Sequence, residues 1–411
     1  MSNPLPGSLT FTLLVVTSSW PSDPFAAQAI KELPDTGIDV SVTCRKRPDE
    51  DWLLHPRLRW VSAQPRYNWL SVRLFRLGWL MIRAVATALG DLRLLVSHAR
   101  QGRSHLESLR ALYRLLPLAG RRWDLIYFNG VSAVLDYLPL FDLGRPVVIN
   151  YEEFNADAAG SDLGATRESL HAALRRASVI HCASETIRQQ ALGLRLEPAK
   201  IRVIRPAVDH IFFCPLEEGP PPSEEFRVIT AGPCMWAGGF EFALLAIRRL
   251  TDQGIPARFD IICSGDADWH ERERILYTIR DLELDDRVRL HEGWPLGEVR
   301  NHLQQSDVFL LSSLQENTSC AALAAMACGL PVVTNDCGGI PKLVTDGVEG
   351  LLVPARDPEA MAEALAILRE DAGLRFRMGR AGRQRVESSF TLAQQVEQLV
   401  SLYRRVLSAA E

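Results

Sequence analysis

The sequence has no large excess of charge, no long apolar run and no paired cysteine motif. Its formal net charge is −4 over 411 residues, which argues against a dedicated nucleic-acid binder. The most apolar segment, 77–89, is broken by Arg83 and falls well short of the roughly 18 residues of a membrane span. The eight cysteines form no C-x-x-C pair, so we expect small buried thiols in a reducing compartment and no metal site. These absences favour a globular, cytoplasmic protein.

Lysine is scarce, and arginine is unevenly spread. The chain has 42 Arg but only 4 Lys, and residues 52–123 hold thirteen Arg against two acids. The same segment contains five Trp, and its apolar residues recur at helical spacing between 70 and 95. Arginine and tryptophan on an amphipathic helix suit an anionic membrane surface, so one interpretation is peripheral contact with the inner face of a membrane. The other is an ordinary solvated helix face in an arginine-rich chain.

Short apolar strands alternate with helical patterns in two rounds. Such strands, separated by helices, indicate parallel sheets covered on both faces. We therefore predict an α/β protein of two Rossmann-like domains, with a cleft between them at the carboxyl ends of the strands, where ligands bind in such folds. The predicted strands are 11–17, 39–43, 125–128, 147–151, 178–183, 201–204, 227–231, 258–263, 287–291, 308–311, 332–335 and 350–353.

The domain limits follow from a proline-rich stretch. Residues 216–225 include three consecutive prolines flanked by acids, which cannot pack as a helix and favour a linker. This places an N-terminal domain at 1–215 and a C-terminal domain at 226–390. A final helical pattern at 391–411, with Thr391 as N-cap, is expected to pack back on the N-terminal domain.

Residues 310–354 are the most informative segment for function. They predict a strand, a polar loop, an alanine-rich helix, a second strand and a glycine turn. The loop 315–319 opens the helix at the end of a buried strand, so its N–H groups are available to anionic or hydroxyl-rich ligands. Gly338 and Gly339 allow the backbone to approach a ligand after the next strand. Each feature alone is generic, since glycine turns commonly just separate strands from helices.

Together, these features resemble a known family. The runs AMACGLPVVTNDCGGIPKLVTDGVEGLLVPARDPEAMAEAL and LRRASVIHCASETIRQQALGLRLEPAKIRVIRPAVDHIFFCP are similar to glycosyltransferase family 4, which comprises retaining sugar transferases of the GT-B fold. WDLIYFNG and RPVVINYEEFN resemble strands of its first domain. The resemblance covers most of residues 120–400 and is weak between 20 and 120. It implies a retaining hexosyltransferase in polysaccharide, glycolipid or natural-product glycoside synthesis, with no cofactor.

The resemblance also implies a donor site in the C-terminal domain, with the N-terminal domain on the acceptor side. The family's E-x7-E pattern places Glu316 on hydroxyls of the transferred sugar, but Ala324 stands where a second Glu would bind the ribose. The family's G-R-x-x-x-x-K-G loop begins here at Gly232, and Pro233 and Gly238 replace the Arg and Lys that bind the donor diphosphate. The further donor-binding candidates are Gly239, Gly293, Trp294, Asn317, Thr318, Ser319, Gly338 and Gly339.

Glu152 is the second catalytic candidate. It stands where the family has a His at the end of a first-domain strand, and there it would steer an acceptor hydroxyl or a cationic acceptor. The other interpretation of Glu152 is a solvated helix entry.

The missing cations leave three hypotheses for function. Two lost hydrogen bonds to charged partners cost about 3–6 kcal/mol, or on the order of a hundred- to ten-thousandfold in affinity. The N–H groups of the turn 236–239 are one source of compensation. The chain is then a transferase for a UDP- or GDP-sugar and an acceptor glycan, lipid or small molecule. The alternatives are a GT-B scaffold without activity that serves as a partner protein, and a transferase that uses a lipid-phosphate sugar.

Overall fold

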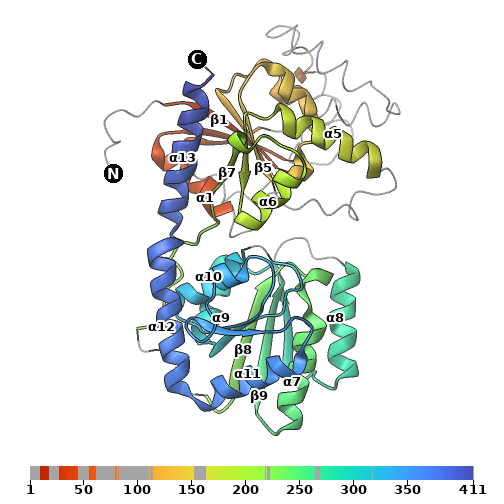
Figure 1. The fold of residues 1–411 in the computed structure, drawn as a ribbon, viewed down its shortest axis with the longest axis vertical. Helices are drawn as coiled ribbons and strands as arrows, with labels where there is room; N and C mark the ends of the chain where they lie inside the picture. Colours follow the sequence, from red (N-terminus) through yellow and green to blue (C-terminus); the bar gives the residue numbers. More distant parts are fainter. Residues whose placement is uncertain are drawn as a thin grey trace. The chain divides into compact units, whose positions relative to one another are not determined.

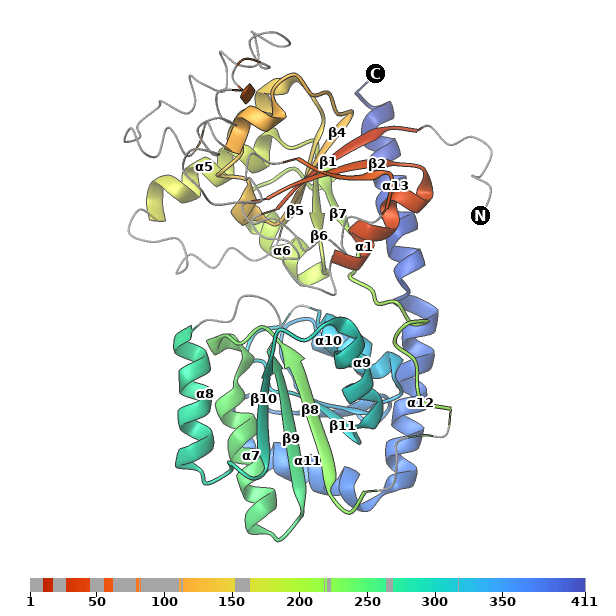
Figure 2. The ribbon, with the colours of Figure 1, turned by 180° about the vertical axis from the view of Figure 1, so that it is seen from behind.

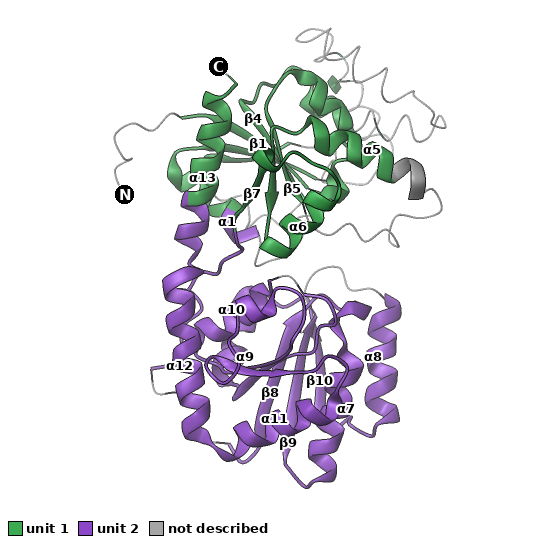
Figure 3. Ribbon diagram, viewed as in Figure 1, with its two compact units in different colours: residues 1–22, 30–204, 398–411 green, residues 23–29, 205–397 purple. Residues whose placement is uncertain are grey.

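The computed structural model describes residues 10–17, 27–44, 55–61, 79–80, 82, 111, 114–151, 163–217, 219, 223–263, 269–316 and 318–410. These residues fall into two compact units, coloured green and purple in Figure 3. Unit 1 comprises the described residues within 1–22, 30–204 and 398–411, and unit 2 those within 23–29 and 205–397. Residues 205–215 group with unit 2 rather than with the strands before them, and the domain limits expected from the sequence stay a prediction.

Unit 1 is built on a seven-stranded parallel sheet in the order β3-β2-β1-β4-β5-β6-β7 (Figure 1). The inner strands β1, β4, β5 and β6 are almost wholly buried, which is why their sequences are continuous apolar runs. The strands are β1 (Thr12–Val16), β2 (Asp39–Thr43), β3 (Leu58–Trp60), β4 (Leu125–Asn129), β5 (Val147–Tyr151), β6 (Val179–Cys182) and β7 (Ile201–Val203). The helices are α1 (Ala27–Glu32), α5 (Leu163–Arg176) and α6 (Glu185–Gly193), with 3-10 turns at Leu33–Thr36, Leu116–Leu118, Val131–Ala133, Leu138–Leu143 and Pro198–Lys200.

Unit 2 is built on a six-stranded parallel sheet in the order β10-β9-β8-β11-β12-β13 (Figure 2). The strands are β8 (Phe226–Gly232), β9 (Ala257–Cys263), β10 (Val288–Glu292), β11 (Val308–Leu311), β12 (Val332–Asn335) and β13 (Gly350–Val353). The helices are α7 (Phe240–Asp252), α8 (Trp269–Asp281), α9 (Leu296–Gln305), α10 (Cys320–Ala327), α11 (Pro358–Glu370) and α12 (Ala372–Ser389), with 3-10 turns at Trp236–Gly238 and Ile340–Lys342. The last helix, α13 (Leu392–Ser408), begins in unit 2, and its residues from 398 on group with unit 1.

Helices cover both faces of the unit 2 sheet. One apolar cluster joins α7, α8 and α11 to the sheet through residues such as Phe259 and Leu365. The opposite cluster joins α9, α10 and α12 to it through residues such as Phe309 and Met326. The strand order reverses at β8, because β9 continues on one side of it and β11 lies on the other. A doubly wound sheet binds ligands at such a reversal, outside the carboxyl ends of the strands.

The last helix, α13, begins as the sequence predicts. Thr391 Oγ1 accepts a hydrogen bond from the N–H of Gln394 at 3.3 Å, which caps the helix. Further along α13, Tyr403 is fully buried in unit 1, with its ring centroid 6.4 Å from that of Phe11 and 5.7 Å from that of Tyr127. Residues 398–408 of this helix group with unit 1.

In the arginine-rich segment, the structure shows an edge strand, β3, that the sequence did not predict. Its three residues are too few to show an alternation of apolar and polar side chains. The helical pattern at 70–95 lies outside the described residues except at 79–80 and 82. Among the described residues, no helix has the length and apolarity that crossing a membrane requires.

The expectation that all eight cysteines are thiols is wrong for two of them. Cys234 and Cys263 form a disulfide, with their Cα atoms 5.4 Å apart. The pairing follows from topology, because Cys263 ends β9 and Cys234 lies two residues beyond Gly232, which pairs with Cys263 in the sheet. The other six cysteines are free.

Candidate functional site

A hollow of about 250 Å³ lies where the strand order of unit 2 reverses. Its wall consists of the carboxyl ends of β8 and β11, the loops that follow them and the first turn of α10. The lining residues are Thr230, Ala231, Gly232, Pro233, Met235, Ala237, Gly238, Phe240, Leu311, Ser312, Ser313, Gln315, Glu316, Thr318, Ser319, Cys320 and Ala321. Five predicted site residues meet there: Gly232, Gly238, Glu316, Thr318 and Ser319.

The loop after β8 is held by a close approach to the loop after β11. Gly239 has a φ of +61°, and a Cβ atom on it would lie 2.3 Å from the carbonyl oxygen of Ser312. Only glycine fits there, because both the left-handed backbone and the contact exclude a side chain. Gly239 does not line the hollow, so its role is this close packing.

The N–H groups of Gly238 and Gly239 are already used inside the turn. Gly238 donates to the carbonyl of Met235 at 2.9 Å, and Gly239 donates to that of Trp236 at 3.1 Å. No described residue accepts a hydrogen bond from the N–H groups of Trp236 and Ala237, the two that open the turn. The amides available to an anion are therefore those of Trp236 and Ala237, the two residues before Gly238.

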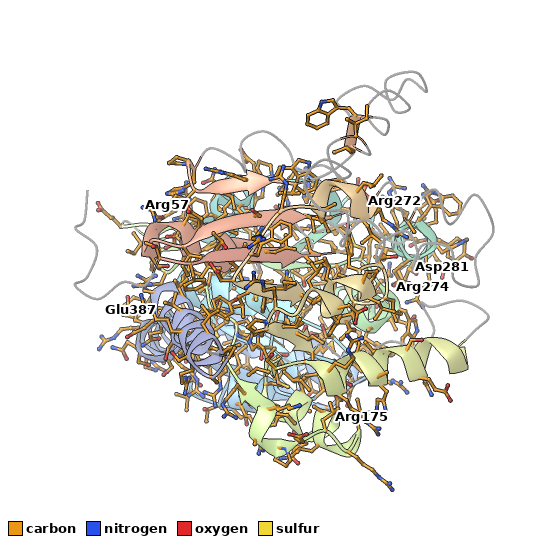
Figure 4. The ribbon with its side chains drawn as sticks, turned by 90° about the horizontal axis from the view of Figure 1, so that it is seen from above. Arg57, Arg175, Arg272, Arg274, Asp281 and Glu387 are labelled. Carbon is orange, nitrogen blue, oxygen red and sulfur yellow. A yellow bond between two sulfur atoms is a disulfide. The ribbon has the colours of Figure 1, made fainter. Side chains whose placement is uncertain are left out.

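No arginine, lysine or histidine lines the hollow among the described residues. Two arginines of α8, Arg272 and Arg274 (Figure 4), form ion pairs with carboxylates. Arg274 donates to Glu271 at 2.9 Å and to Glu241 on α7 at 2.8 Å, and its hydrogen bonds to Glu271 are the main cause that raises its pKa. These ion pairs fasten α8 to the start of α7 and do not replace the missing cations.

Glu316 is half-buried and is the one acidic residue that lines the hollow among the described residues. Its carbonyl accepts a hydrogen bond from the N–H of Gly339 at 2.9 Å, and Ser313 Oγ lies 3.4 Å from its Oε2. Gly338 has a φ of +55°, and a Cβ atom there would lie 2.0 Å from the carbonyl oxygen of Glu316. Gly338 and Gly339 therefore hold the Glu316 loop, and neither lines the hollow.

The charge of Glu316 affects the pKa of a neighbouring thiol, that of Cys337. The pKa of Cys337 is raised to about 11, first by burial and then by the charge of Glu316. Cys337 Sγ lies 3.3 Å from the carbonyl oxygen of Ser313. The thiol is thus a neutral residue behind the loop rather than a nucleophile at neutral pH.

The first turn of α10 is shaped for close approach. Ser319 caps it by accepting the N–H of Ala322 on Oγ at 3.2 Å. All eight residues of α10 are buried, and five of them are alanine, so the helix is thin and packs tightly on the sheet. Ala324, where the family has its ribose-binding Glu, is fully buried and does not line the hollow.

Other candidates lie elsewhere or outside the described residues. Gly293 and Trp294 follow β10, two strands away from β8, and do not line the hollow. The Trp294 ring packs between those of His291 and His302, with centroid distances of 4.0 and 4.2 Å. Glu152 and Asn317 are not among the described residues. No group of three or more possible metal ligands occurs in the part of the chain that the structure describes.

Sequence reasoning missed Asn335, at the end of β12. Its side chain is fully buried and donates to the carbonyls of Ser312 and Ser313, the residues that lead into the Glu316 loop. The available signal was a polar residue closing an otherwise apolar strand next to the glycine turn.

The two doubly wound units define the class: this is a GT-B glycosyltransferase fold. Among solved structures it resembles sucrose-phosphate synthase from Thermosynechococcus elongatus, with a TM-score of 0.73 and 19% identity, covering 97% of this chain and 100% of that one. It also resembles Anabaena HepE in complex with UDP and glucose, with a TM-score of 0.70 and 17% identity, covering 95% of this chain and 98% of that one.

The family follows from sequence matches. Residues 22–207 match the model of the glycosyl transferase 4-like domain, and residues 225–371 match that of the glycosyl transferases group 1. Alpha-maltose-1-phosphate synthase from Mycolicibacterium smegmatis is 30% identical over 312 residues, which covers 70% of this chain and 76% of that protein. The chain belongs to the group 1, family 4-like glycosyltransferases.

Relatives from polysaccharide synthesis match over a shorter length. Amylovoran biosynthesis glycosyltransferase AmsK from Erwinia amylovora is 31% identical over 189 residues, covering 44% of this chain and 46% of that protein. The first three curated relatives are matched over about half of their own length, with shares of 50%, 42% and 46%.

Proposed function

We propose that the chain transfers a hexose, with retention of configuration, from a UDP- or GDP-sugar to an acceptor hydroxyl. The setting is polysaccharide, glycolipid or natural-product glycoside synthesis. The observation that supports this best is the hollow at the reversal of strand order. It is lined by Glu316 and by residues of the turn at 235–238, in which the N–H groups of Trp236 and Ala237 are unused. The C-terminal domain, 226–390, would bind the donor, and the N-terminal domain, 1–215, the acceptor.

Backbone groups would hold the diphosphate in place of side-chain cations. The N–H groups of Trp236 and Ala237 open a 3-10 turn that leads directly into α7, a helix of 13 residues. The start of such a helix carries about half a positive charge, which favours an anion. Gly238 carries no side chain, and the ring of Phe240 occupies the space that a Cβ there would need, 2.5 Å away.

Glu316 would position the sugar. Its carboxylate accepts hydrogen bonds from hexose hydroxyls and fixes the ring relative to the diphosphate. In a retaining transfer by this route, the C1–O bond to phosphate breaks while the acceptor oxygen bonds to C1 on the same face. The leaving phosphate oxygen takes the acceptor proton, so the protein supplies orientation and charge stabilisation rather than a nucleophile. We assign to Glu152 the steering of the acceptor hydroxyl.

Two comparisons support the choice of substrates. HepE, which shares the fold, was solved with UDP and glucose. AmsK, which matches part of the chain, serves amylovoran biosynthesis. The first favours a nucleotide-sugar donor for this chain, and the second favours a glycan-building role.

The test is turnover of a panel of UDP- and GDP-hexoses, with release of UDP or GDP as the readout. We expect at least slow donor hydrolysis by the wild type, and its loss in Glu316→Ala. The anomeric configuration of a transfer product, read by NMR, decides between retention and inversion. A wild type that neither binds nor hydrolyses any donor would refute the proposal.

A scaffold without activity is the second candidate. It is favoured by one observation, the lack of any described basic side chain in the hollow. The two candidates differ in the same assay, because a scaffold leaves every donor intact. A lipid-phosphate sugar as donor, with residues 52–123 on an anionic inner membrane face, stays a separate prediction. Flotation of the protein with anionic and with neutral liposomes tests it.

A further inference from the structure

Hydrogen bonds anchor the backbone of the turn that borders the hollow. Its four consecutive carbonyls all accept hydrogen bonds from N–H groups or a hydroxyl. Two of the bonds come from within the turn and two from the loop after β11, so both neighbouring segments fix its path. The pairs are Met235 O with Gly238 N (2.9 Å), Trp236 O with Gly239 N (3.1 Å), Ala237 O with Leu314 N (2.7 Å), and Gly238 O with Ser312 Oγ (2.8 Å).

This anchored turn presents two large apolar side chains to solvent. Met235 is 44% exposed and Trp236 is 55% exposed. Burying such a side chain fully contributes about 1.5–3 kcal/mol, so the fold forgoes a stabilising contact at two adjacent positions. A fixed backbone with exposed apolar side chains is what a preorganised binding surface requires, because little freedom is lost when a ligand covers it.

The position of the two side chains points to their ligand. Met235 and Ala237, the residues before and after Trp236 in the chain, line the hollow, whereas Trp236 itself does not. The exposed indole therefore projects from backbone that borders the hollow and lies outside its lining. The hollow, at about 250 Å³, lies below the roughly 300–1,000 Å³ of pockets that enclose a whole drug-sized ligand. A nucleotide sugar must therefore extend past the rim.

We propose that Trp236, with Met235 beside it, forms a specificity-determining surface for the hexose of the donor. This rests on the proposed function. The N–H groups of Trp236 and Ala237 bind the diphosphate, so the two sugars bonded to it, the hexose and the ribose, lie within reach of the indole. A hexose has an apolar C–H face that packs on an aromatic ring, and hydroxyls that Glu316 can bind. A nucleobase is also flat, but the ribose separates it from the diphosphate.

The test compares affinities for a nucleotide and its sugar, using UDP with UDP-glucose and GDP with GDP-mannose by calorimetry. We expect Trp236→Ala to weaken binding of the nucleotide sugar about five- to tenfold. Binding of the bare nucleotide should change less than twofold. Trp236→Phe should stay within about threefold of the wild type for both, because it keeps a ring.

Trp269→Ala is the matched control. Trp269 is 65% exposed at the start of α8 and does not line the hollow, so its loss should leave both affinities unchanged. Equal weakening of nucleotide and nucleotide sugar in Trp236→Ala would mean a base or ribose contact and would overturn the proposal. So would no weakening at all. If the wild type turns over its donor, the proposed function stands whatever Trp236→Ala does. If the wild type binds neither UDP and UDP-glucose nor GDP and GDP-mannose, both the proposed function and the role of Trp236 are refuted.

Discussion

The side-chain amide of Asn335 joins β12 to Ser312, at the start of the loop that carries Glu316. Its Nδ2 donates to the carbonyl of Ser312 at 2.8 Å and to that of Ser313 at 2.9 Å. Its Oδ1 is buried and has no hydrogen-bond partner among the described residues. A buried polar atom without a partner lowers the stability of the fold, so the two hydrogen bonds from Nδ2 must contribute more than that cost.

Asn335→Leu should therefore both destabilise the fold and misplace the carboxylate. Two buried carbonyls lose their donors, which lowers the free energy of unfolding by about 1–3 kcal/mol. Urea denaturation measures this, with Asn301→Leu on the partly exposed α9 as control. We expect the donor turnover number to fall about tenfold, while the affinity for the bare nucleotide is kept. Unchanged stability and turnover would show that the hydrogen bonds from Asn335 to the two carbonyls are dispensable.

Gly338→Ala is expected to disrupt the same loop from the other side. A Cβ there meets the carbonyl oxygen of Glu316 at 2.0 Å, and the φ of +55° is strained for alanine. We expect a loss of roughly 2–4 kcal/mol in stability, since steric overlap adds to backbone strain. Gly347→Ala separates the two effects, because Gly347 has a φ of +75° but nothing within 4 Å of an added Cβ. Equal losses in the two variants would mean that the contact with Glu316 does not matter.

The strands of both sheets were predictable from sequence because parallel strands buried on both faces are continuous apolar runs. β3 was not predicted, since three edge residues are too few to show a pattern. Five of the predicted site residues line one hollow, because Gly232 ends β8, Glu316 follows β11, and the carboxyl ends of these adjacent strands meet at one edge. Their role in binding stays a prediction.

Contacts between distant segments were beyond the sequence. Nothing in the spacing shows that the Gly238 and Gly239 amides are used inside the turn, or that Gly339 binds the Glu316 carbonyl. Trp294 illustrates the same limit: its strand lies two positions from β8 in the sheet order. That order is set by packing rather than by local pattern.

The number of free thiols in the unreduced protein tests the Cys234–Cys263 disulfide. Maleimide labelling after denaturation without reductant is expected to modify the six free cysteines and to reach all eight only after reduction. Cys234→Ser with Cys263→Ser should lower stability by about 2–4 kcal/mol, because the cross-link restricts the unfolded chain. Cys214→Ser, which removes a free cysteine in the same unit, is the control. Eight labelled thiols in the unreduced protein would contradict the pairing.

Alkylation of Cys337 should depend on pH and on Glu316. With a pKa of about 11, the thiol is almost wholly protonated at pH 8, so iodoacetamide should react slowly and speed up as the pH rises towards 11. Glu316→Gln removes a negative charge that raises this pKa, so the thiolate fraction at a given pH should increase. Peptide mapping of the alkylated site measures both rates. A rate that Glu316→Gln leaves unchanged at every pH would show that the carboxylate does not act on this thiol.

The most direct measurement is turnover of UDP- and GDP-hexoses by the wild type and by Glu316→Gln, together with calorimetric affinities for UDP and GDP. We predict that the wild type releases nucleotide from at least one donor. Glu316→Gln should lower that rate by about a hundredfold or more, since it removes a charged hydrogen-bond acceptor from the sugar. Its affinity for the bare nucleotide should stay within about threefold of the wild type, because the turn at Trp236 binds the phosphates. Glu298→Gln on α9 should behave as the wild type. A protein that leaves every donor intact, or a Glu316→Gln variant as active as the wild type, would contradict transfer at this hollow.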